Sequence, residues 1–232
     1  MTKTFEKSRH CLYRVVMSLD LQMLRPIFSA SLASDALDAL GHRNQVLGAS
    51  IEMLSGEGTL MGFAFPVEIE VVTRAPEIAY VGLLSALDAV GKDQVYVTPT
   101  QRLGHASLWG ELLSTACSFK GVAGALTDGP VRDLTRTRAM GFKVFGVGSS
   151  PLDINSRYEV IAHNVAGVID GVTIHPGDLI VADVDGVVIV PISAIDSVIS
   201  HVKEKDSGES EFRKAVKSGM SPSAAFAKFG VL

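Results

Sequence analysis

The sequence predicts an α/β fold with a core of parallel strands. Between residues 95 and 147, short apolar runs alternate with helical stretches, and glycine or proline marks most of the boundaries. Strand–helix–strand spacing of this kind is typical of a parallel sheet. After Pro151 the pattern changes to short β-like runs separated by turns, and after Pro191 it becomes helical.

Helices are expected over residues 34–41, 78–90, 109–120, 131–140 and 192–230, the last with a break near Gly219. In the first of these, Ser34 is a plausible N-cap and Gly41 a plausible C-terminal stop. In the fourth, Pro130 can occupy the first helical position, because its missing N–H would be unpaired there in any case.

Strands are expected over residues 67–71, 95–97, 122–126, 143–147, 165–169, 172–174, 179–182 and 187–190. Hairpin turns are expected at 170–171, 176–178 and 185–186, because Asp-Gly and Pro-Gly-Asp are turn sequences. Little can be assigned to residues 1–28. Without an internal repeat or a low-complexity linker, the expectation is one domain over residues 1–232, with a core at about 30–191 and a C-terminal helical extension over 192–232.

Composition excludes several classes of protein. The chain has 232 residues, of which 47% are hydrophobic and 20% charged, which is an ordinary globular balance. The net charge of −4 argues against general binding to nucleic acid or to an anionic membrane. Two cysteines give no disulfide framework, and Cys117 is expected to be a core residue. A polar start without a signal-peptide pattern predicts a cytoplasmic protein.

Two loop-to-helix junctions could carry chemistry, at residues 110–113 and 128–133. In an α/β sheet, ligands bind beyond the carboxyl ends of the strands, and a helix start offers N–H groups that suit a carboxylate. Arg132 adds a planar fork that can hold a carboxylate by two hydrogen bonds. Asp133 could face a metal, since Mg²⁺ keeps several waters and needs only one or two carboxylates.

Structural roles remain open for the same residues. Asp133 and Glu111 stand near helix starts, where an acid complements the helix dipole, and Arg132 could be a solvated surface residue. Taken one residue at a time, these roles are slightly better supported than catalysis.

The motif at these junctions resembles a known family, that of ribonuclease E activity regulator A and the 4-hydroxy-4-methyl-2-oxoglutarate aldolases. That family carries an acidic residue, twenty intervening residues and then Arg-Asp, and Glu111 precedes Arg132 by this spacing. The resemblance extends over roughly residues 30–191, through the segments 34–37, 109–113, 121–125, 127–133, 176–183 and 185–191.

The resemblance implies an αββα sandwich that assembles into homotrimers or homohexamers. It implies that pyruvate is held by the backbone N–H groups of the loop matching Gly110, Glu111, Leu112 and Leu113, and by Arg132. Asp133 would bind Mg²⁺, or Mn²⁺, directly, and Glu111 would act on the metal's waters. Some members also use an acid from the C-terminal region of a neighbouring subunit, for which the candidates here are Glu204, Glu209 and Glu211.

The expected function is therefore that of a metal-dependent aldolase with Glu111, Arg132 and Asp133 as catalytic residues. It would cleave a 4-hydroxy-2-oxo acid, such as 4-hydroxy-4-methyl-2-oxoglutarate, to pyruvate, and would also decarboxylate oxaloacetate. The alternative is a non-catalytic regulator that binds a ribonuclease or another protein. About forty residues follow Pro191, and this extension favours the enzyme, because the regulator is shorter.

Overall fold

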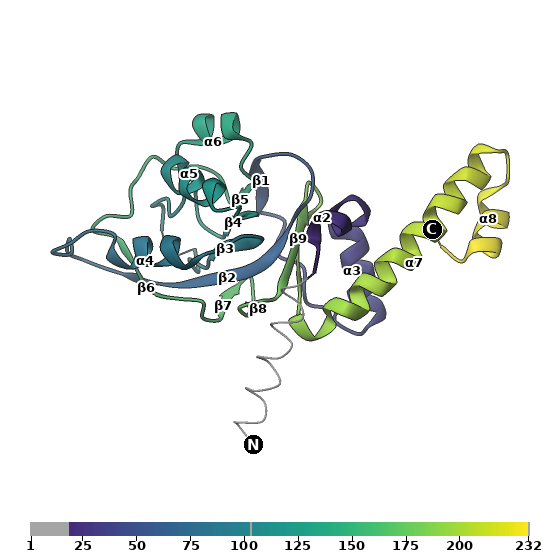
Figure 1. Ribbon diagram of the computed structural model, residues 1–232, viewed down its shortest axis with the longest axis horizontal. Helices are drawn as coiled ribbons and strands as arrows, with labels where there is room; N and C mark the ends of the chain where they lie inside the picture. Colours follow the sequence, from purple (N-terminus) through teal and green to yellow (C-terminus); the bar gives the residue numbers. More distant parts are fainter. Residues whose placement is uncertain (1–18, 103, 232) are drawn as a thin grey trace, which may run out of the picture.

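The computed structural model of the chain describes residues 19–102 and 104–231, so that Cys11 and the start of the chain lie outside the described residues. Its centre is a mixed sheet in the order β1-β5-β4-β3-β2-β9-β10, with β6 paired to the distal part of β2 (Figure 1). A separate hairpin contains β7 and β8. The strands are β1 (Glu52–Ser55), β2 (Leu60–Val71), β3 (Gln94–Thr98), β4 (Gly124–Thr127), β5 (Val144–Gly146), β6 (Tyr158–His163), β7 (Gly167–Ile169), β8 (Val172–Ile174), β9 (Leu179–Asp183) and β10 (Gly186–Val190).

The expected parallel core is confirmed. Strands β2, β3, β4 and β5 are parallel neighbours, whereas β1, β6, β9 and β10 pair antiparallel. The carboxyl ends of the four parallel strands therefore lie at one edge of the sheet, which is where ligands bind in folds of this type.

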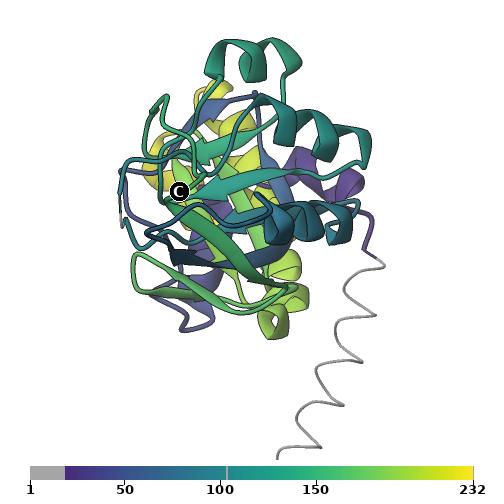
Figure 2. The same cartoon turned by 90° about the vertical axis from the view of Figure 1, so that its left-hand side faces the viewer.

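Two helical layers cover the outside of the curled sheet (Figures 1 and 2). The helices are α2 (Leu21–Leu24), α3 (Ala30–Ala39), α4 (Val81–Ala89), α5 (Glu111–Phe119), α6 (Leu134–Met140), α7 (Ile195–Lys217) and α8 (Pro222–Phe229), with 3-10 turns η1 (Arg25–Ile27) and η2 (Ile192–Ala194). α3 and α7 pack over β9 and β10, while α4 and α5 cover the parallel strands. The inner faces of the sheet enclose a third apolar cluster together with the β7–β8 hairpin.

Strand β2 connects these layers. Its residues Met61 and Phe63 pack under α3 and α7, whereas Phe65 and Val67 pack under α4. The alternate residues, such as Ala64, point into the inner cluster. Since successive side chains of a strand point to opposite faces, β2 holds both helical layers and the interior together. The result is the αββα arrangement that the resemblance implied.

Several expected boundaries were wrong. Helix α3 is capped by Ser29, whose Oγ accepts a hydrogen bond from the Leu32 N–H at 3.1 Å, and not by Ser34, which lies inside the helix. The expected stop at Gly41 is confirmed, with φ 85° just after the helix end. Pro130 does not begin a helix, because α6 starts only at Leu134.

The strands also differ from the sequence-based expectation. The long first half of β2 and the whole of β1 and β6 were missed. The turn at residues 176–178 is present but joins no hairpin, because β8 pairs with β7 while β9 pairs with β2 and β10. The turn at residues 170–171 does join the β7–β8 hairpin, as expected.

The C-terminal extension is helical, as predicted. The first turns of α7 pack on the body through Ile195, Val198, Ile199 and Val202. The rest of α7 and all of α8 project away from the sheet (Figure 1). Ser218 and Gly219 interrupt the two helices near the expected break. No helix within the described residues is both long and apolar enough to cross a membrane.

Candidate active site

Each of the four parallel strands contributes one loop to a single site. Tyr80 follows β2, Gly110 follows β3, Arg132 and Asp133 follow β4, and Asp153 follows β5. Backbone bridges hold these loops side by side: Val131 is bridged to Trp109 on one side and to Ser149 on the other. The Arg132 N–H also donates to the Trp109 carbonyl at 2.9 Å. The site is thus fixed to the edge that the fold reserves for ligands.

Arg132 lies between two carboxylates. Its Nε is 3.5 Å from Oδ2 of Asp133, and its Nη1 is 3.2 Å from Oδ1 of Asp153. No hydrogen bond of its third nitrogen, Nη2, is recorded among the described residues. The guanidinium is therefore oriented by the protein and retains a donor for a ligand.

Gly110 allows the start of α5 to approach this pair closely. A Cβ at this position would lie 3.0 Å from Oδ2 of Asp133 and 3.1 Å from Cγ of Arg132. No side chain caps α5 at Gly110. The N–H groups of the first helical turn have no acceptor within the helix, so those of Glu111, Leu112 and Leu113 are available to a carboxylate.

Asp133 does not cap the helix that follows it. It precedes α6 with φ 56° and ψ 29°, and its side chain makes no capping hydrogen bond. Aspartate caps normally have an extended backbone and bond to the first turn. The side chain of Asp133 is 46% exposed, so its carboxylate can reach a ligand from solvent. The left-handed conformation of a non-glycine residue at this point is the kind of local strain that clusters at functional sites.

Tyr80 and Asp153 are site residues that the sequence analysis missed. The Tyr80 hydroxyl donates to Oδ2 of Asp153 at 2.5 Å, and the Ile154 N–H donates to Oδ1 at 2.8 Å. The hydrogen bond to Asp153 raises the pKa of Tyr80. Neither residue belongs to a recognisable motif, and only the tertiary fold brings them to Arg132.

Glu111 lies at the first position of α5, next to Gly110. Its Oε1 accepts a hydrogen bond from the Thr115 hydroxyl at 3.0 Å. No contact with Arg132 or Asp133 is recorded for its carboxylate among the described residues. The structure therefore brings Gly110, Arg132 and Asp133 together and places Glu111 one residue away along the helix.

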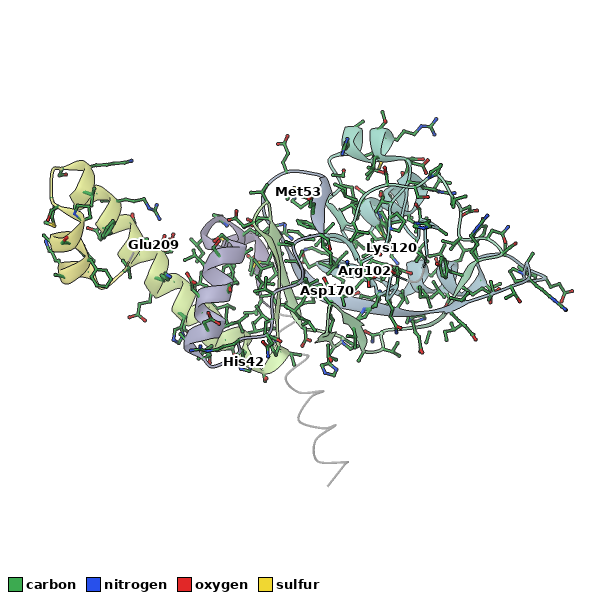
Figure 3. All side chains as sticks on the ribbon, turned by 180° about the vertical axis from the view of Figure 1, so that it is seen from behind. His42, Met53, Arg102, Lys120, Asp170 and Glu209 are labelled. Carbon is green, nitrogen blue, oxygen red and sulfur yellow. The ribbon has the colours of Figure 1, made fainter. Side chains whose placement is uncertain are left out.

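A further bond anchors the loop that leads to Gly110. Arg102 forms an ion pair with Asp170 at 2.8 Å (Figure 3), which ties this loop to the β7–β8 hairpin. The N–H of Thr100 donates to the buried carboxylate of Asp128, at the end of β4. Asp128 is thus a structural residue of the loop.

Two hollows meet at Arg132. One is open and polar, with a volume of about 660 Å³, and is lined by residues 131–136 and 149–151. The other is mostly apolar, with a volume of about 370 Å³, and lies between α4 and α5. Arg132 lines both, whereas Asp133 lines only the polar one.

A divalent cation held by a single carboxylate fits the residues at this site. No cluster of three or more His, Cys, Asp or Glu side chains that could hold a metal occurs within residues 19–102 and 104–231. Both oxygens of Asp153 already accept hydrogen bonds, so Asp133 is the carboxylate that could serve as the protein ligand. That donor set suits Mg²⁺ or Mn²⁺, which accept oxygen ligands and retain waters, and does not suit a structural zinc site.

The acids of the C-terminal extension lie away from this site in the same chain. Glu209, on the projecting part of α7, pairs with Arg213 at 3.0 Å (Figure 3). Glu211 pairs with Lys214 at 2.7 Å, and this hydrogen bond lowers the pKa of Glu211. Glu204 is exposed and has no ion pair recorded within the described chain.

Cys117 plays no part in the site. It lies on the buried face of α5, and burial raises the pKa of its thiol to about 12. The thiolate, which is the nucleophilic form, is therefore scarce near neutral pH.

The fold and the site together define an αββα protein with an arginine placed between two aspartates at the carboxyl edge of its sheet. A family model described as RraA-like, Aldolase/RraA, matches residues 30–189. The chain belongs to this RraA-like family.

Individual relatives show modest identity. The chain is 29% identical over 199 residues to the protein DlpA of Legionella pneumophila, covering 86% of this chain but only 32% of that protein. It is 27% identical to a "Putative 4-hydroxy-4-methyl-2-oxoglutarate aldolase" of Halalkalibacterium halodurans, covering 79% and 82% of the two chains. The crystal structure of Streptomyces coelicolor RraAS2, described as an unusual member of the RNase ES inhibitor RraA family, superposes with a TM-score of 0.70 at 27% identity, covering 80% of this chain and 91% of that one.

Proposed function

We propose that this protein is a divalent-cation-dependent carbon–carbon lyase that cleaves a 4-hydroxy-2-oxo acid, such as 4-hydroxy-4-methyl-2-oxoglutarate, to pyruvate and a carbonyl compound. The observation that carries the proposal is the convergence of Arg132, Asp133 and the uncapped start of α5 at one point of the sheet edge. The name of the Halalkalibacterium halodurans relative supports the same chemistry.

Binding of the substrate follows from the donors present. Nη2 of Arg132 and the N–H groups of Glu111, Leu112 and Leu113 would hold the substrate carboxylate. Asp133 would hold Mg²⁺ or Mn²⁺, which supplies Lewis-acid stabilisation of negative charge on the oxygens of the 2-oxo acid when bound. Asp153 keeps the guanidinium directed toward this point.

Cleavage requires a base and a stabilised enolate. Glu111, whose Oε2 has no protein partner among the described residues, would help to accept the proton of the 4-hydroxyl group. The C3–C4 bond then breaks, C4 becomes a carbonyl carbon, and the electron pair remains on C3 as the enolate of pyruvate. Arg132 and the helix-start N–H groups stabilise the enolate charge before C3 takes up a proton.

The same site would decarboxylate oxaloacetate as a side activity. Loss of CO₂ from that acid leaves the same pyruvate enolate, so no additional group is needed. The reaction provides a simple second assay for the proposed site.

The test is pyruvate release from 4-hydroxy-4-methyl-2-oxoglutarate and oxaloacetate, with Mg²⁺ and with a chelator. Asp133→Asn and Arg132→Lys should each lower kcat/KM by about 10² to 10³, because the first removes the carboxylate that would hold the cation and the second removes the planar set of donors that would hold the substrate carboxylate. Asp133→Asn should also weaken Mn²⁺ binding, measured by calorimetry. Asp38→Asn, at an exposed position of α3, is the matched control and should behave as the parent protein. Near-normal activity of either site variant would refute the assignment.

A second candidate is a non-catalytic regulator that binds a ribonuclease, as the description of the Streptomyces structure suggests for that protein. Binding to a nuclease without turnover of any 2-oxo acid would favour this reading.

The assembly is proposed to be a homotrimer or a homohexamer, in which α7 of one subunit brings an acid to a neighbouring site. Of the candidates Glu204, Glu209 and Glu211, only Glu204 has no ion pair recorded within the described chain. It is therefore the first acid to substitute in a test of this role.

A further inference from the structure

We infer that the apolar hollow between α4 and α5 binds the substituent on C4 of the substrate, so that the preferred 2-oxo acids carry an alkyl or aryl group there. The inference rests on the proposed function and extends it to a substrate class. It predicts a preference for a neutral, apolar group over a second carboxylate.

The hollow has the size and the walls of a small-molecule site. Its volume of about 370 Å³ falls within the range of about 300–1,000 Å³ that is usual for ligand pockets. Its walls are apolar side chains of two helices and two loops: Leu83, Leu87, Trp109, Leu113, Ala116 and Ile154. Burying an apolar group against such walls is favourable in proportion to the area removed from water.

The charged side chains that line this hollow, Arg132 and Asp153, form one ion pair, and Tyr80 is hydrogen-bonded to it. Asp153 is neutralised by Arg132 and accepts hydrogen bonds from Tyr80 and Ile154, so it requires no cation from a ligand. Arg132 can still donate a hydrogen bond from Nη2, which a ligand carboxylate can accept. The complementary occupant is therefore a carboxylate with an apolar tail.

Arg132 also places this hollow beside the proposed catalytic point, because it lines both hollows. It lines the polar hollow together with Asp133, and Gly110 lines the apolar one. A 2-oxo acid held by its carboxylate at Arg132 can thus extend its C4 substituent between α4 and α5. Arg132 would hold the carboxylate end of the 2-oxo acid whichever substituent the acid carries on C4.

Two alternatives, a second substrate carboxylate bound in the polar hollow and a second copy of the chain covering the apolar one, lead to different predictions. The polar hollow contains a second cation, Arg136, which would attract the second carboxylate of a dicarboxylic substrate. The rim of the apolar hollow exposes Leu84 (55%) and Leu112 (71%), which a second copy of the chain could cover. Substrate preference and subunit mass separate these cases.

The first experiment compares 4-hydroxy-2-oxo acids whose C4 substituent is methyl, propyl, isobutyl, phenyl or carboxymethyl. Each added methylene should raise kcat/KM by about fourfold until the hollow is filled. The phenyl compound should exceed the methyl compound by more than tenfold. A flat series, or a preference for carboxymethyl, would overturn the inference while leaving the proposed lyase intact.

The second experiment fills the hollow. Ala116→Phe should lower the phenyl-to-methyl ratio of kcat/KM at least tenfold, because the new ring occupies the space of the substrate's ring. Ala139→Phe, at an exposed position of α6 that lines neither hollow, is the matched control and should keep the ratio. If Ala116→Phe changes the subunit mass in solution and leaves the ratio unchanged, the hollow is a contact between copies and the inference fails.

A binding measurement separates this inference from the proposed reaction. 2-Oxobutanoate and 4-phenyl-2-oxobutanoate lack a 4-hydroxyl group and cannot be cleaved. Calorimetry on the full chain with Mg²⁺ should give at least tenfold tighter binding of the phenyl compound, and Ala116→Phe should abolish the difference. Tail-dependent binding without turnover of any substrate would sustain the apolar subsite and refute the lyase. Equal binding of the two acids would refute the subsite.

Discussion

Arg132 is oriented by two carboxylates that have different roles. Asp133, which is adjacent in sequence, is exposed and has a left-handed backbone conformation, and its side chain does not cap α6. Its carboxylate can therefore reach a ligand. Asp153 has both oxygens engaged and is placed to hold the guanidinium. A planar group held at one nitrogen loses less freedom when it binds a carboxylate at another.

Asp153→Asn should therefore weaken substrate binding more than it slows the chemical step. The amide can still bond to Tyr80 and Ile154 but no longer attracts Arg132, so we expect KM for the 2-oxo acid to rise about tenfold and kcat to fall less than threefold. Steady-state kinetics with a thermal melt would check both. Asp93→Asn, which removes a comparable ion pair with Arg25 at the opposite end of β3, is the control. Equal rises in KM for both variants would show that the effect is not specific to the site.

At the residue scale, the sequence predicted the part of the site that has a local pattern. Arg132, Asp133 and Gly110 stand at helix starts with a recognisable spacing, and the structure brings them together. Tyr80 and Asp153 carry no such pattern, because their role depends on loops that follow different strands. Pairing across loops is a tertiary property that local sequence does not encode.

At the level of elements, burial determined which strands could be recognised. The exposed Glu68 and Glu70 alternate with apolar residues and marked the end of β2, whereas Leu60–Val67 is buried on both faces and shows no alternation. Helix starts were misplaced where two capping residues compete, as Ser29 and Ser34 do in α3. Helix ends marked by glycine were easier to predict, because a glycine such as Gly41 adopts the left-handed conformation that ends a helix.

Helix α4 approaches β6 so closely that only glycine fits at one point. A Cβ on Gly82 would lie 1.7 Å from the carbonyl oxygen of Val160. Gly82→Ala should therefore displace α4 and lower the free energy of unfolding by about 3 kcal/mol, as overpacking does in rigid cores. It should also weaken substrate binding, since Tyr80 precedes this helix.

Urea unfolding and pyruvate release would test this expectation. Gly91→Ala is the matched control, because its Cβ would meet only Gln94 Oε1 at 3.6 Å, an ordinary contact. An unfolding free energy of the Gly82 variant within 0.5 kcal/mol of the parent, a change typical of surface substitutions, would contradict the proposed packing.

At the scale of the whole molecule, the two helical layers differ in function. The layer of α4 and α5 borders the site, whereas the layer of α3 and α7 closes the core on the far side of the sheet. The buried side chains of α7 extend from Ile195 to Val202, in the part of the chain that follows the last strand, β10. The first part of the extension is thus integral to the core, and only its distal part projects.

Two truncations should separate these parts. Removal of residues 219–232 deletes α8 and should shift the melting temperature by less than about 4 °C, an effect of about 1 kcal/mol or less. Removal of residues 195–232 also deletes four buried apolar side chains, each contributing about 1.5–3 kcal/mol, and should leave the protein unfolded. Circular dichroism melts would report both outcomes. A stably folded product of the longer deletion would show that α7 is dispensable for the core.

The shared position of Arg132 has a consequence for how such proteins diversify. In the proposed site, the charge that would anchor an acid comes from the turn after β4, while the walls that would contact the rest of the ligand come from α4 and α5. Substitutions of the apolar side chains on the two helices would therefore alter which compounds are accepted while leaving Glu111, Arg132 and Asp133 in place. New specificities are accessible by changing leucines and alanines alone, with the anchoring guanidinium left in place.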